Sequence, residues 1–350
     1  MMSFRHRQFG LSLVELMIAI TLGLILMIGV MQMFLSSKVV FATQQGISRI
    51  QETGRLAIEF LSRDIRMAAY YGCYRPSVVA GSELKYSNMV ISGLHGNFSE
   101  GIRGFDSDQS LPVSKAQALG GSIQLLPSTH TANIIVIRSA SETGIPINNL
   151  NTETQIRAYS PSSIENNCIN NICVNSAAVV NNCSSAAVMR VTALAKAGTD
   201  VTITHNGTWN PLTVPSEAFL SGEVMPLNTT VYFIARGVSG VPTLWQKTNA
   251  DAAVELLEGV EHMRITYATS DNINYRLASQ LSADDWPKVN SVRLELVIRS
   301  IDNNVLEDTQ PYQFAGVTVT PVDVGGIKDR YMRQVFTATI AIRSRATNIQ

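Results

Sequence analysis

The segment FRHRQFGLSLVELMIAITLGLILMIGV, from Phe4 to Val30, decides how this chain is organised. It is a nearly unbroken apolar run that carries an acid, Glu15, in its first part. A carboxylate in hydrocarbon costs about 2.5 to 3.5 kcal/mol even on a lenient insertion scale, so acids at such positions usually have a function. The role of Glu15 is therefore the first question that the sequence raises.

The apolar run is long enough to cross a membrane as a helix. Residues 11–35 would span roughly 37 Å, against about 30 Å for the hydrocarbon core. The clearly polar residues of this span are Ser12, Glu15, Thr21 and Gln32. Because Arg5 and Arg7 precede the span and no similar basic cluster follows it, the N-terminus is expected in the cytoplasm and the later residues outside it.

Two simpler interpretations compete for this segment. A secretory signal peptide also starts with basic residues and an apolar run, but this run is longer than usual and no small-x-small cleavage site follows it. A plain single-span anchor explains the length and leaves Glu15 without a role. Glu15 could also lie near the cytoplasmic interface and reach toward water.

Composition sets wider bounds. The chain has 350 residues, 45% of them apolar, and its 27 Lys and Arg balance its 27 Asp and Glu. This is enough apolar material for one large domain or two modest ones, and the charge balance favours neither nucleic acid nor an acidic surface as a partner. Four cysteines suit one or two disulfides in an exported domain, and the sequence leaves three full pairings open. They are Cys73, Cys168, Cys173 and Cys183.

The helical pattern continues past the apolar run. Apolar or small residues recur at spacings of three and four from Ile47 to Ala68, with charged residues on the other side, so we predict one helix from about Leu11 to about Tyr70. No proline interrupts its first half, and Gly23 and Gly29 are its weaker points. Gly72 and Pro76 then end it.

Short runs of alternating and β-branched residues follow, which predict strands. The candidates are 133–138, 187–194, 200–205, 230–235, 263–268, 291–299 and 334–343. We expect an α+β, pilin-like fold in which the long helix packs on a mainly antiparallel sheet. The Asn- and Ser-rich residues 141–185 are interpreted as a long surface excursion held by a disulfide.

The N-terminal motif resembles the class III signal of type IV pilins and pseudopilins. A basic leader ends in Gly10, and Glu15 is the fifth residue after it. The resemblance implies that a prepilin peptidase cuts between Gly10 and Leu11 and methylates the new amino terminus of Leu11, where Phe is usual. That amine would lie about 6 Å along the helix from Glu15. Between neighbouring subunits, such a pair is worth roughly 4 kcal/mol at 4 Å and an effective dielectric constant of 20, which would fix their axial register.

Later segments resemble the PilW family of minor pilins, which are similar to the pseudopilin GspJ of type II secretion. The segments are TVYFIA, TLWQ, LLEGVEHMRITYAT, WPKVNSVRLELVIRS and RQVFTATIAIRSR, at 230–235, 243–246, 256–269, 286–300 and 333–345. The family usually ends in RNR. Here Arg343, Ser344 and Arg345 stand in its place, and we expect them to form a solvated end of the last strand.

The resemblance implies a division into four parts: a leader at residues 1–10, a membrane or fibre-core helix at 11–35, an amphipathic continuation at 36–75 and a β-rich exported domain at 76–350. It implies an inner-membrane protein that later joins the fibre, initiates its assembly and sits at or near its tip. The implied partners are other minor pilins, the major pilin, a tip adhesin, the prepilin peptidase and the assembly platform. Twitching motility, adhesion or DNA uptake would be the output, and a GspJ-like pseudopilin of type II secretion is the alternative.

The sequence carries no pattern typical of an enzyme, and we expect no catalytic residue, cofactor or metal. The histidines, which are His6, His95, His130, His205 and His262, are not at ligand spacing. Residues 106–110, DSDQS, lack the Gly and the terminal Glu of a calcium loop. A cysteine metal site is weaker than a disulfide because no CxxC pair is present, and nucleotide, hydrolase and nucleic-acid motifs are missing. A membrane-anchored periplasmic enzyme is the remaining class.

Overall fold

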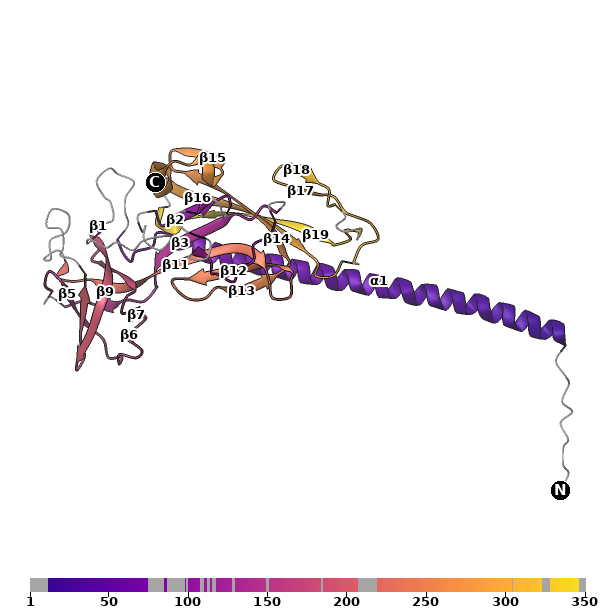
Figure 1. The fold of residues 1–350 in the computed structure, drawn as a ribbon, viewed down its shortest axis with the longest axis horizontal. Coiled ribbons are helices and arrows are strands. Elements are labelled where there is room, and N and C mark those ends of the chain that lie inside the picture. The colour runs from indigo at the N-terminus through magenta and orange to yellow at the C-terminus, as the bar shows by residue number, and fades with distance from the viewer. Residues whose placement is uncertain are drawn as a thin grey trace, which may run out of the picture.

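The computed structural model shows one long helix and a large β domain (Figure 1). The structure describes residues 12–74, 85–86, 98, 100–107, 110–111, 114, 118–127, 130–148, 151–183, 185–206, 219–303, 305–322 and 328–345.

Helix α1 (Leu13–Arg66) is a single α-helix of 54 residues. Its N-terminal half extends away from the domain, and its C-terminal half lies along it (Figure 1). The helix continues without a break through Gly23 and Gly29, where no other atoms lie within 4 Å of the added methyl position. It ends at Arg66, and Ala69, three residues later, takes a positive φ of 57°.

The larger of two main sheets has eleven strands, with the path β13-β12-β11-β8-β9-β10-β5 and four further strands that pair outside this path. Its strands are β1 (Lys85–Tyr86), β2 (Ile102–Phe105), β3 (Ile134–Ala140), β4 (Ile145–Pro146), β5 (Gln155–Tyr159), β8 (Ala177–Asn181), β9 (Ala186–Ala197), β10 (Asp200–His205), β11 (Glu223–Arg236), β12 (Pro242–Thr248) and β13 (Val254–Glu258). Among the described strand pairs of both sheets, β1 with β9 is parallel and all others are antiparallel.

The second sheet has four strands in the order β15-β14-β16-β19. They are β14 (Val260–Thr269), β15 (Asn272–Arg276), β16 (Val289–Arg299) and β19 (Arg333–Ala341). Two small hairpins complete the strands: β6 (Cys168–Ile169) with β7 (Ile172–Cys173), and β17 (Tyr312–Phe314) with β18 (Val317–Val319). Short 3-10 helices are η4 (Ala278–Gln280), η5 (Ala283–Lys288) and η6 (Arg343–Arg345).

The main core lies between α1 and the strands that it crosses. Ile50, Ala57, Leu61 and Ile65 bury one stripe of the helix against residues such as Leu294 on β16. Trp286, the largest fully buried side chain among the described residues, meets Tyr267 edge to face, with ring centroids 5.0 Å apart. The predicted fold class is therefore confirmed: one long apolar helix followed by a mainly antiparallel β domain.

All seven predicted strands coincide with observed strands, but residues 141–185 differ from their prediction. They contain β4, β5, β6, β7 and β8. All five residues of β8 are buried in the larger sheet, and Ile156 of β5 is fully buried. The interpretation of this stretch as a surface excursion is wrong, because short apolar runs such as AAVV are buried as inner strands of a sheet despite the polar residues around them.

The expectation for the C-terminal arginines is also wrong in part. Arg343 is exposed, but Arg345 is 8% exposed and lies in η6 rather than at a solvated strand end. Its guanidinium donates to the carbonyl oxygens of Trp286 at 2.8 Å, of Val289 at 3.0 Å and of Glu100. Burial lowers the pKa of Arg345 to about 10. A buried cation is retained here because backbone carbonyls replace its water.

Candidate functional site

The candidate site is the free half of α1. Every residue from Ser12 to Ala42 is exposed, including Leu13 at 73% and Phe41 at 67%. This part of the helix is long and apolar enough to cross a membrane by length and composition. An apolar helix surface of this size is unfavourable in water, so it requires lipid or other apolar helices around it.

Glu15 is the acid in the first turn of this helix. Its side chain forms no ion pair or hydrogen bond with another described residue. The residues expected to pair with it in assembly, and the cleavage position Gly10–Leu11, lie outside the described residues. The structure therefore presents Glu15 as an exposed carboxylate on an otherwise apolar surface, four residues from the expected new terminus.

The C-terminal half of α1 is fixed to the domain by close packing. A methyl group added at Gly54 would lie 2.4 Å from the Phe336 ring on β19, so the missing side chain allows helix and strand to approach. Further along, the Tyr232 hydroxyl donates to Asp64 at 2.7 Å and accepts from Gln246 at 2.8 Å. Burial, then the neighbouring Asp64 charge, raises the pKa of Tyr232 far above its usual range. Its hydroxyl thus remains a hydrogen-bond donor.

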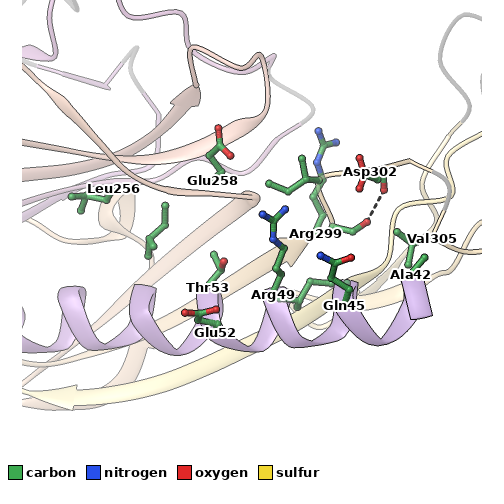
Figure 2. Close-up of a pocket in the computed structure, with 15 residues that line it drawn as sticks. Ala42, Gln45, Arg49, Glu52, Thr53, Leu256, Glu258, Arg299, Asp302 and Val305 are labelled. Carbon is green, nitrogen blue, oxygen red and sulfur yellow. Dashed lines mark hydrogen bonds between the residues drawn. The ribbon is translucent and has the colours of Figure 1, made fainter. Parts of the chain in front are cut away.

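A pocket of about 330 Å³ opens where the free half of the helix meets the domain (Figure 2). Arg49 and Glu52 reach it from α1, while Glu258 and Arg299 reach it from the sheets. Both signs of charge line it, and Arg299 is already paired with Glu261 at 3.4 Å. This mixed lining does not resemble a catalytic constellation and is suited to polar contacts at the base of the helix.

The four cysteines form two disulfides, which settles the pairing that the sequence left open. Cys73 is joined to Cys183 and Cys168 to Cys173. The Cys73–Cys183 disulfide joins the chain just after α1 to the turn between β8 and β9, 110 residues later in the sequence. The second closes the small β6–β7 hairpin, where Cys168 and Cys173 are direct cross-strand partners.

Histidines of the domain have structural contacts. His262 is 8% exposed, stacks on His130 with ring centroids 5.1 Å apart, and accepts the Thr131 N–H at Nδ1, 3.0 Å away. The Tyr312 hydroxyl lies 3.2 Å from its Nε2. Burial lowers the pKa of His262 to about 4 and also lowers that of His130. Among the residues that the structure describes, no three His, Cys, Asp or Glu side chains gather as metal ligands.

One buried charge cluster was missed by sequence reasoning. Arg333 donates to Glu261 at 2.6 Å and 3.0 Å and to Asp329 at 2.7 Å and 2.8 Å. Burial alone would raise the pKa of Glu261, but the hydrogen bonds and charge of Arg333 outweigh it and hold that pKa below its usual value. Glu261 and Arg333 are 72 residues apart, so no local pattern could have indicated the pair.

Comparison with known protein families finds a match near each end of the chain. Residues 5–31 match the model of the prokaryotic N-terminal methylation motif, and residues 231–344 match that of the type IV pilus-assembly protein W family, PilW. No curated protein matches the chain. A type IV-like pilin from Thermus thermophilus is 17% identical, covering 49% of this chain and 84% of its own, with a TM-score of 0.24. At that TM-score the likeness supports no conclusion about this chain.

A methylation motif on an exposed apolar helix, followed by a β domain, defines a type IV pilin-like protein. More particularly, residues 231–344, about a third of the chain, match the PilW family model, so this part of the chain is PilW-like, as its segments indicated. The helix and the methylation motif fit a membrane-anchored pilin that assembles with other pilins.

Proposed function

We propose that this protein is a minor pilin of the type IV pilus that acts by assembly and without chemistry of its own. Prepilin peptidase cuts after Gly10 and methylates Leu11, leaving a subunit held in the inner membrane by residues 11–35, with its N-terminus in the cytoplasm. The subunit then joins other minor pilins, the major pilin and a tip adhesin to start the fibre at or near its tip. Motility, adhesion or DNA uptake follow from the whole fibre.

The observation that carries this proposal is the exposed apolar helix with a single acid near its start. Residues 12–42 are exposed on all sides, and the domain itself covers none of them. A plain anchor needs length and hydrophobicity but no carboxylate. An acid at Glu15 is favourable when a neighbour's amine pairs with it, because the attraction is comparable to the cost of burial in hydrocarbon.

The first experiment tests processing. Mass spectrometry of the N-terminus should find a chain that begins at methylated Leu11 in cells with prepilin peptidase, and an intact leader in cells without it. A Gly10→Glu variant should keep its leader in both strains. A leader that is retained in peptidase-positive cells, or a cut beyond residue 30, would contradict the proposal.

The second experiment tests Glu15 separately from cleavage. Glu15→Ala should be cleaved normally and leave at least tenfold fewer surface fibres, because the neighbour's amine loses its partner. Glu15→Gln keeps the size of the side chain and should show the same defect if charge matters. Thr21→Val is the matched control, since the Thr21 hydroxyl bonds to its own helix at Met17 and Ile18 carbonyls, 3.1 and 2.9 Å away. Fibre counts that are equal in all variants would remove the proposed role of Glu15.

A further inference from the structure

The outer edge of β19 is a long, regular strand edge with no partner in the part of the chain that the structure describes. β19 pairs with β16 along all nine residues, and the register shows no shift. It forms one end of the four-stranded sheet. Its sequence, RQVFTATIA, contains no proline or lysine and carries a charge only at Arg333, which turns inward to Glu261.

The backbone groups at this edge can be assigned. Ile342 donates to the carbonyl of Asn290, and Ser300 donates to that of Met332, both at 2.8 Å. In an antiparallel ladder, hydrogen-bonded and non-bonded pairs alternate, so even-numbered residues of β19 bond to β16. The N–H and C=O groups that point away from β16 belong to Val335, Thr337, Thr339 and Ala341.

Three other edge strands of the two sheets are protected, as expected of edges that must not pair. β13 carries Glu255 and Glu258, and its register shifts opposite Leu244 and Trp245. β5 is short, and the bridge from Ile147 to Ala158 covers part of it. β15 has five residues and an irregular register. β19 has none of these features, which suits an edge that pairs with another chain.

Basic side chains flank this edge. A groove of about 880 Å³ runs between α1 and the end of β19. It is lined by exposed Arg55, Arg63, Arg66 and Arg343, with Glu59 and Glu142 as its acids. Arg63 is paired with its neighbour Asp64 at 3.3 Å, while Arg55, Arg66 and Arg343 form no ion pair among the described residues. Four arginines against two acids give this groove an excess of positive charge beside the end of β19.

Arginines also lie over the opposite face of the same strand. Arg264 and Arg293 share a pocket with Thr337 and Thr339, and Glu295 is the acid there. Arg264 is paired with Glu295 at 3.4 Å, and Arg293 stacks on the Tyr275 ring at 4.1 Å. Arg264 lies on β14 and Arg293 on β16, both inward of β19, and both are already engaged. The basic side chains nearest to a strand added at the outer edge are therefore those of the groove beside α1.

We propose that β19 is a docking edge that accepts an extended, acidic segment of a partner protein as an added strand. Backbone hydrogen bonds would supply the affinity, and carboxylates that face the arginines of the groove beside α1 would supply the specificity. The edge strand β13 of a second copy is a poorer fit, since both of its acids already have hydrogen-bond partners. Glu255 accepts the Val238 N–H at 2.7 Å, and Glu258 accepts the Ser239 hydroxyl at 2.6 Å. The inference does not depend on cleavage at Gly10.

The test uses the full chain in detergent and a blocked eight-residue peptide of alternating glutamate, valine and threonine, labelled for fluorescence anisotropy. Binding should raise the protection of the outward amides of Val335, Thr337 and Thr339 against hydrogen exchange. Thr337→Pro removes one outward N–H and blocks pairing without removing a bond to β16, so it should weaken binding at least tenfold. Thr337→Ala keeps the N–H and should bind like the wild type.

Charge is tested by Arg63→Glu with Arg66→Glu, which should weaken binding several-fold, and by a peptide with lysine in place of glutamate, which should bind at least tenfold more weakly. A peptide methylated on alternate backbone nitrogens tests pairing on the unaltered protein, even if Thr337→Pro unfolds. Equal binding of the methylated peptide, or no binding of the acidic one, would overturn the proposal. The proposal would also fail if sedimentation found a dimer of the wild-type chain that the Thr337→Pro variant does not form, because the edge of β19 would then pair with a second copy.

Discussion

The two halves of α1 form one continuous helix but have opposite surroundings. From Ser12 to Ala42 every side chain is exposed, whereas Ile50, Ala57, Leu61 and Ile65 are at most 2% exposed. The first half is mainly apolar around the whole helix, with Glu15 and Lys38 as its charged residues, and the second has one apolar stripe and a charged flank. The difference shows that the domain needs only the second half, and that the first half is adapted to lipid or to other helices.

The largest effect on the domain should come from a cavity under the second half. Leu61→Ala deletes a fully buried side chain and should lower the free energy of unfolding of the domain by about 2 to 5 kcal/mol. Denaturant unfolding of the full chain in detergent measures this change. Leu22→Ala, at a residue that is 56% exposed, is the control and should leave domain stability unchanged. Equal losses for both variants would mean that the two halves are not energetically separate.

Lowering the pH should reduce the stability of the domain but not that of the free half of α1. The pKa of His262 is lowered from 6.5 to about 4 in the folded protein, so folding favours its neutral form. Above pH 6.5 His262 is neutral in both the folded and the unfolded chain, and the domain has its full stability. As the pH falls from 6.5 toward 4, the unfolded chain binds a proton that the folded one does not, and the free energy of unfolding drops by about 3 kcal/mol. His130, whose pKa is also lowered, adds to the same trend.

Unfolding curves at pH 7, 6, 5 and 4.5 measure the effect. In His262→Asn, whose Oδ1 can take the place of Nδ1 as acceptor for the Thr131 N–H, the decline between pH 6.5 and 4.5 should be smaller than in the wild type. A variant that declines as steeply as the wild type would assign the acid sensitivity to other groups.

Glycine-to-alanine substitutions should change the stability of the domain in the second half of α1 but not in the first. Gly54→Ala places a methyl group against the Phe336 ring and should destabilise the domain by about 1 to 3 kcal/mol. Gly29→Ala meets no atoms within 4 Å and should leave the domain unchanged, while its helix gains up to about 1 kcal/mol of intrinsic preference. Thermal unfolding of the two variants beside the wild type checks this; a stabilising Gly54→Ala would show that β19 can move away from the helix.

The smallest effect should come from the hydrogen bond near the end of α1. Tyr232→Phe removes the donor to Asp64 and the acceptor for Gln246, at a cost of about 1 kcal/mol. Tyr159→Phe alters an exposed tyrosine and serves as the control. If the two variants have the same stability, the bond between helix and sheet contributes nothing measurable.

Periodicity predicted the parts of the fold that local patterns encode. The helix was expected at about 11–70 and is observed at Leu13–Arg66, and the run 200–205 coincides with β10. The stretch 141–185 was misjudged because β5 and β8 are short and lie among Asn and Ser. Arg345 was misjudged because its partners are carbonyls on Trp286, Val289 and Glu100, far away in the sequence.

The sequence by itself determined the apolar helix, the motif around Gly10 and Glu15, the α+β class and the resemblance to PilW, because each is written in local spacing and residue type. The tertiary structure decided what depends on distant neighbours. It paired Cys73 with Cys183, buried Arg333 between Glu261 and Asp329, and left the edge of β19 open beside a row of arginines. Strand order and side-chain partners arise from contacts between residues far apart in the chain, and periodicity in the sequence carries no record of them.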